Sequence, residues 1–68
     1  MKAEFYKAGQ RIILATSCRY TVFYTVPLSA ISELVLENAT AMEAVTYMIK
    51  NPIPSDVLYE VHTIEAVN

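Results

Sequence analysis

Cys18 and His62 are the residue types that could form a nucleophile–base pair, and the 68-residue chain has one cysteine and one histidine. A cysteine beside a histidine can act as a nucleophile with its general base. Any chain with one residue of each type offers this pair, so we interpret Cys18 as a partly buried small hydrophobic residue. We interpret His62 as a strand residue. Glu60 lies on the same side of that strand and could share a proton with His62, but so short a chain leaves little material for a pocket.

Other kinds of chemical site lack the residues that they need. One cysteine and one histidine make a poor zinc ligand set, and the acidic residues lack the clustered spacing of a calcium loop. A phosphate-binding loop needs several glycines, whereas Gly9 is the only glycine of the chain. We therefore expect no enzymatic activity, no cofactor and no metal ion.

The length of 68 residues allows a single domain, 1–68, in which 54% of the residues are hydrophobic. Domains of this size often need disulfides, a metal ion or a partner for stability. Cys18 cannot form an internal disulfide by itself. Elimination leaves oligomerisation or a host partner, so we expect the protein to associate through an apolar face, with a homodimer as one form.

The formal net charge of −2 is too small to indicate a class of partner. The charges are nevertheless uneven, because residues 1–19 carry a local excess of +3 and residues 20–68 a local excess of −5. Met1 and Lys2 are not followed by the apolar segment of a signal peptide. The longest nearly uncharged stretch, 20–32, contains Pro27 and is too short to span a bilayer. These features lead us to expect a cytoplasmic protein that does not bind membranes.

A helix is predicted over residues 40–50. Its apolar residues recur at the spacing of one helical face, at Ala41, Ala44, Val45, Met48 and Ile49. Thr40 and Glu43 have the spacing of a capping box, in which each side chain accepts a hydrogen bond from a backbone N–H of the first turn. At the other end, the residue before Pro52 is restricted to extended conformations, which predicts that the helix ends there.

The remaining residues favour β-strands. Residues 2–7 and 11–16 are predicted to form a hairpin around Gly9, because a three-residue hairpin loop wants a residue with positive φ. Residues 20–26 alternate clearly, with Tyr20, Val22, Tyr24 and Val26 on one face. The other face is polar apart from Phe23, so we expect it to be solvated or to lie against a partner.

Two segments are harder to interpret. Residues 28–38 fit either a short helix capped by Ser29 or a strand over 32–37 in which Leu34 and Leu36 share a face; we favour the strand. Residues 56–67 form the last predicted strand, with Val57, Tyr59 and Val61 directed inward. The alternation then slips, which predicts a β-bulge or bend near residues 62–63.

Together these elements predict an α+β fold. An antiparallel sheet of about five strands has one helix, 40–50, on a single face, in the order βββ-β-α-β. Because one helix cannot cover five strands, we expect the uncovered area to be where a second subunit or a target binds.

Aromatic and charged residues supply the candidates for that contact. Tyrosine occurs five times, and its ring offers a large contact area at low entropic cost. Helical spacing places Glu43, Tyr47 and Lys50 in one outward stripe beside Met42. The full set of predicted partner-binding residues is Met42, Glu43, Tyr47, Lys50, Phe23, Tyr6, Arg11 and Arg19.

In size and composition the chain resembles small accessory proteins encoded by bacteriophages. The resemblance implies a non-catalytic protein-interaction module in the host cytoplasm that inhibits or modulates a host enzyme or defence complex by occupying a surface. A small-ligand or nucleotide-binding homo-oligomer, with its site at the subunit interface, is the alternative. A third hypothesis is weak binding of single-stranded nucleic acid by the basic N-terminal third, since aromatic residues beside arginines can stack on bases. The negative net charge argues against it.

Overall fold

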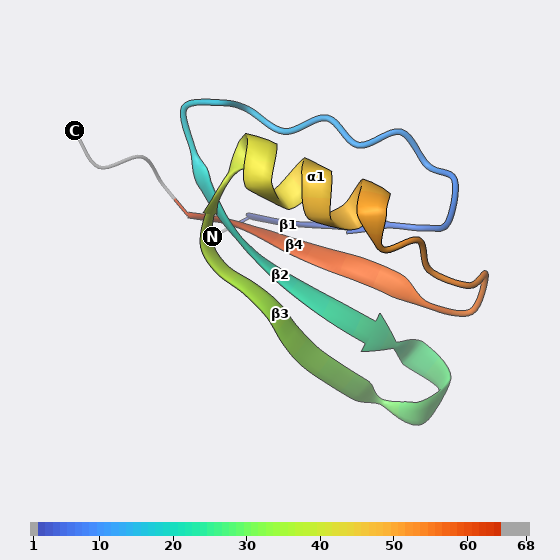
Figure 1. The fold of residues 1–68 in the computed structure, drawn as a ribbon. Helices are drawn as coiled ribbons and strands as arrows, with labels where there is room; N and C mark the ends of the chain where they lie inside the picture. The colour runs from blue at the N-terminus through green and yellow to red at the C-terminus, as the bar shows by residue number, and fades with distance from the viewer. Residues whose placement is uncertain (1, 65–68) are drawn as a thin grey trace.

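One antiparallel sheet and one helix make up the fold (Figure 1). The computed structural model describes residues 2–64. Its elements are β1 (Lys2–Tyr6), β2 (Arg19–Val26), the 3₁₀ turn η1 (Pro27–Ser29), β3 (Ile31–Thr40), α1 (Ala41–Lys50) and β4 (Leu58–Ile64). The strands lie in the order β1-β4-β2-β3, and α1 packs over β2 and β3. The predicted α+β class with a helix on one face of the sheet is therefore confirmed.

Four strands are present among the described residues, one fewer than predicted, because residues 11–16 form no strand. β1 pairs with β4 instead of with its neighbour in sequence. Since β4 is antiparallel to both β1 and β2, these two strands are parallel to each other. Parallel strands cannot be joined by a tight hairpin and need a crossover of about a dozen residues. Residues 7–18 provide it, arching over the same side of the sheet as α1 (Figure 1).

The favoured strand in residues 28–38 is confirmed. β3 starts at Ile31, and the helical turn near this segment is η1, which precedes the strand. The predicted shared face of Leu34 and Leu36 is wrong, because the pairing with β2 shifts register between Val22 and Phe23. This bulge turns Val35 and Leu36 towards the core and leaves Leu34 exposed.

The capping box of α1 is also confirmed. The Thr40 hydroxyl accepts a hydrogen bond from the Glu43 N–H at 3.1 Å, and the Thr40 N–H donates to Glu43 Oε1 at 2.8 Å. The helix ends at Lys50, and the N–H of Asn51 bonds to the carbonyl of Tyr47. Local interactions thus determine both ends of the helix.

The predicted bulge at residues 62–63 is wrong. β4 keeps a continuous register with β1 and β2 through this region, with Ala3 opposite His62 and Tyr20 opposite Thr63. Thr63 therefore lies opposite the core residue Tyr20 without any break in the strand. Residues 65–67 of the predicted strand lie outside the described part of the chain.

The core lies between the sheet and the layer formed by α1 and residues 7–18. Val57, Tyr59 and Val61 are buried, as predicted. Ile12 and Leu14 of the crossover pack against this core from the side that α1 leaves free. The central cluster contains Tyr6, Tyr20, Val22, Ala39, Ala41, Ala44, Met48, Tyr59 and Val61.

Candidate interaction surfaces

One whole face of the sheet carries no second layer among residues 2–64. It consists of the side chains that alternate with the core residues, and we call it the open sheet face. Pairing of the strands places Phe5 opposite Glu60, Glu60 opposite Phe23, and Phe23 opposite Leu34. Phe5 is 51% exposed and Leu34 is 47% exposed. The open sheet face is defined by Phe5, Thr21, Phe23, Leu34, Glu60 and His62.

A polar pair lies at the centre of this apolar row. His62 Nε2 and Glu60 Oε2 are 2.5 Å apart, and the Thr25 hydroxyl lies 3.4 Å from the other carboxylate oxygen of Glu60. The Phe23 ring meets the His62 imidazole edge-on, with their centroids 5.3 Å apart. Glu60 is thus held in place between aromatic residues of neighbouring strands.

The second surface is a groove along the side of α1, next to β3. We call it the helix-side groove; its volume is about 440 Å³, and it is lined by Leu36, Thr40, Met42, Glu43, Thr46, Tyr47, Lys50 and Asn51. Met42 stands 78% exposed at its border. Hydrogen bonds that the Glu43 carboxylate accepts from the Thr40 backbone N–H and from the Thr40 side chain lower the pKa of Glu43 and so favour its ionised form. The groove therefore has apolar walls, an anion near the start of the helix and the Lys50 ammonium at its end.

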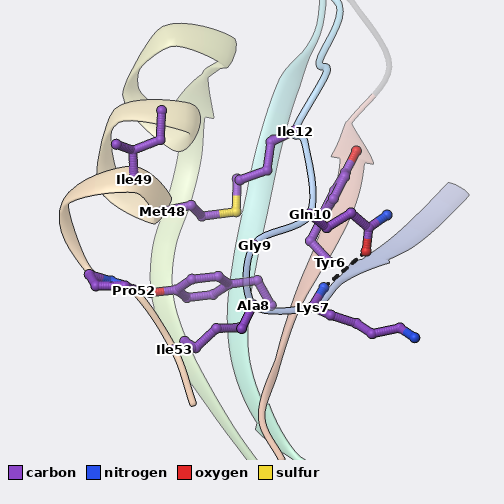
Figure 2. A pocket seen from close by; sticks show the side chains of 11 residues that line it. Tyr6, Lys7, Ala8, Gly9, Gln10, Ile12, Met48, Ile49, Pro52 and Ile53 are labelled. Carbon is purple, nitrogen blue, oxygen red and sulfur yellow. Dashed lines mark hydrogen bonds between the residues drawn. The ribbon is translucent and has the colours of Figure 1, made fainter. Parts of the chain in front are cut away.

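A smaller cavity of about 290 Å³ lies between the crossover and the end of α1 (Figure 2). Ala8 and Ile12 come from the crossover, whereas Met48 and Ile53 come from the other side. The Lys7 side chain extends away from Met48 and Ile53 in Figure 2, and the Gln10 carboxamide accepts a hydrogen bond from the Lys7 N–H. Such apolar walls fit a compact apolar molecule better than a nucleotide.

Six of the eight predicted partner-binding residues belong to, or lie beside, these two surfaces. Met42, Glu43, Tyr47 and Lys50 line one groove together, Phe23 lies in the open sheet face, and Arg19 begins the strand that carries Phe23. Arg11 is exposed on the crossover, away from both sets.

Tyr6, also predicted as a contact residue, lies in the core with 4% of its surface exposed. Its hydroxyl reaches the carbonyl of Ile13 and the carboxylate of Glu4. Sequence reasoning missed Phe5 and Leu34, because only the order and register of the strands bring them into one row with Phe23. The groove residue Leu36 was missed for the same reason, since the bulge decides which way it points.

Cys18 and His62 do not form a dyad. Cys18 packs against the core cluster, whereas His62 alternates with buried Val61 and lies on the opposite side of the sheet. In residues 2–64, no three side chains of His, Cys, Asp or Glu gather closely enough to hold a metal ion. The sole helix of that range is too short to cross a membrane.

The class of protein that these observations define is a small α+β domain with an antiparallel sheet, a groove beside its helix and an uncovered sheet face among residues 2–64. Comparisons with protein-family models, with curated proteins and with solved structures found no match. The functional argument therefore rests on the chemistry of the two surfaces.

Proposed function

We propose that this protein is a non-catalytic interaction module that binds another protein through the helix-side groove and so blocks or modulates it. The observation that carries the proposal is that the outward stripe of α1 lines one groove with Leu36 of the edge strand β3. Met42 is exposed on this helix face, and Tyr47 is half-buried with its ring edge-on to the core residue Tyr59. A helix face of this kind beside a strand edge is typical of surfaces that receive a segment of another protein.

The charges of the groove indicate the chemistry of the partner. Glu43 and Lys50 are seven residues apart on α1, which corresponds to about 10 Å along a helix axis. An extended segment advances about 3.3 Å per residue. The groove therefore suits a segment with a basic and an acidic residue about three positions apart and an apolar side chain between them. For the target we propose a host enzyme or defence complex, as the bacteriophage resemblance implies.

A matched pair of variants tests this function. Met42→Asp places a charge in the groove, whereas Leu28→Asp makes the same kind of change at the 93% exposed tip of the β2–β3 hairpin. Both side chains are well exposed, so neither change should disturb folding. We expect affinity capture from host lysate with mass spectrometry to recover one protein with the wild type and with Leu28→Asp.

Recovery by Met42→Asp should fall about tenfold or more, because the aspartate must be desolvated in an apolar contact. A single well-exposed apolar contact residue can cost that much when it is replaced by a charge. Equal recovery by all three proteins, or no protein enriched over an unrelated bait, would reject binding through the helix-side groove.

A further inference from the structure

We infer that the open sheet face binds a second copy of this chain, so that two sheets pack face to face around a two-fold axis with Arg19 of each copy contacting Glu60 of the other. This goes beyond the proposed function, because the helix-side groove lies on the other side of the sheet and stays free in such a dimer.

The apolar part of the open sheet face supplies the first reason. Phe5, Phe23 and Leu34 form a row across three of the four strands. Phe5 and Leu34 are about half exposed, and Phe23 is half-buried beside the His62 ring. A sheet is stable when each apolar face packs against another layer. The core side has its layer in α1 and the crossover, whereas the apolar row of the open side has none among residues 2–64.

The size of the face is adequate for a reversible dimer. Four strands about 4.8 Å apart, with about six residues of roughly 3.3 Å each, present a projected area of roughly 400 Å² per copy. The accessible surface that two copies bury is larger than their combined projected area, because side chains make the face uneven. It approaches the roughly 1,000 Å² that marks the low end of specific interfaces. We therefore expect an equilibrium between monomer and dimer.

Charge complementarity selects a second copy as the occupant. Arg19 and Glu60 are the residues of opposite formal charge on this side of the paired strands β2 and β4, and Glu60 lies opposite Phe23, four positions from Arg19. Four positions correspond to roughly 13 Å along a strand. Consider a two-fold axis that runs between the two sheets, midway between the positions of Arg19 and Glu60. This axis places Arg19 of one copy over Glu60 of the other, and the reverse.

The side chains are suited to that contact. The Arg19 guanidinium donates one hydrogen bond to the Asn38 carbonyl at 3.0 Å, and its charge helps to lower the pKa of Glu43 at the start of α1. Its remaining donors can still reach a carboxylate of a second copy. Sheets packed face to face are about 10 Å apart, a gap that an arginine and a glutamate span together. Without the dimer contact, an apolar layer would bury Glu60 with only His62 and the Thr25 hydroxyl as partners. In the dimer Glu60 gains the arginine of the other copy.

A charge-swap cycle followed by sedimentation equilibrium tests the dimer. The four proteins are wild type, Arg19→Glu, Glu60→Arg and the double variant, each checked for native circular dichroism. Wild type should dimerise, and each single variant should weaken dimerisation about tenfold or more, because like charges then face each other. The double variant should recover most of the lost affinity, since it restores both opposite-charge contacts with their signs exchanged.

Two further variants keep the test decisive. Leu34→Asp removes an apolar contact at an exposed position and changes neither Arg19 nor Glu60, so it should also yield monomers. It tests the dimer independently if a charge variant fails to fold. Lys50→Glu changes a charge in the helix-side groove and should leave the dimer intact. A strictly monomeric wild type, a dimer unaffected by Leu34→Asp, or a double variant no better than the singles would overturn the inference.

Discussion

Backbone conformation at single residues sets local limits on this small fold. Among residues 2–64, three have positive φ: Gly9 at 76°, Ala30 at 53° and Asn38 at 53°. Glycine adopts this region freely and asparagine tolerates it, whereas the Cβ of alanine clashes with the neighbouring carbonyl oxygen. Ala30 is therefore the strained member of the three.

Substitutions at Ala30 and Gly9 should shift stability in opposite directions. Ala30→Gly should raise the free energy of unfolding by about 1 kcal/mol, because relief of strain outweighs the added freedom of the unfolded chain. Gly9→Ala should lower it by about 1 kcal/mol through backbone strain alone, since a Cβ there would meet no atom within 4 Å. Urea unfolding measures both changes, and Ala15→Gly, in the crossover, is the control. A less stable Ala30→Gly variant would contradict the argument.

At the scale of elements, the junction between β3 and α1 depends on its capping box. Thr40→Ala leaves the Glu43 N–H without its side-chain acceptor, so stability should fall by about 1 kcal/mol. The reciprocal bond makes the junction sensitive to acid, because the folded-state pKa of Glu43 lies below its ordinary value. The ionised Glu43 carboxylate therefore contributes to the free energy of unfolding at pH values above the ordinary glutamate pKa. That contribution is lost as the pH falls through the pKa of Glu43 in the folded protein.

Urea titrations of wild type and Glu43→Gln at several pH values measure that dependence. The advantage of wild type should be present at neutral pH and shrink as the solution is acidified. Glu33→Gln removes a carboxylate away from the end of the helix and should not reproduce the effect. An advantage that stays constant down to acid pH would show that the carboxylate contributes nothing through its bond to Thr40.

The same elements show which parts of the fold could be read from sequence. α1 was predicted to within one residue, because its apolar spacing and its cap between Thr40 and Glu43 are local. The partner of β1 was not, because a β-branched pair such as Ile12-Ile13 suits a strand and a packed crossover equally well. Only the position of β4, far along the chain, decides between them.

The helix-side groove and the open sheet face also differ in how far their residues could be predicted from the sequence. The stripe of Glu43, Tyr47 and Lys50 follows from helical geometry, so its members could be grouped before the structure was known. The row containing Phe5, Phe23 and Leu34 depends on strand order and on a bulge, and no local pattern encodes either.

At the scale of the whole molecule, three buried tyrosines of the sheet donate hydrogen bonds to the segments that connect its strands. The hydroxyls of Tyr6 and Tyr20 donate to the carbonyls of Ile13 and Ala15 in the crossover, at 3.4 and 3.0 Å. Tyr59 donates to the carbonyl of Asn51 after the helix, at 2.6 Å. Each phenol must stay protonated to make its bond.

The pKa of each of these three tyrosines is raised above its ordinary value of 10.0, chiefly because burial disfavours the phenolate. Glu4 adds to the effect at Tyr6, and neighbouring tyrosines add to it at Tyr59. The unfolded chain therefore releases these protons at a lower pH than the folded chain does. Below pH 10 the three phenols should not make the free energy of unfolding depend on pH. The free energy of unfolding should then fall as the pH rises through the raised pKa values of the folded protein.

Urea midpoints measured from neutral to strongly alkaline pH, with tyrosinate absorbance recorded alongside, test this expectation. Ionisation of the buried phenols should coincide with unfolding, because a phenolate would lose its donor hydrogen and face a backbone carbonyl. Tyr59→Phe should make the alkaline decline shallower, since it removes one of the three linked protons. Full ionisation of all tyrosines in a folded protein would show that these hydroxyls do not hold the crossover and the helix to the sheet.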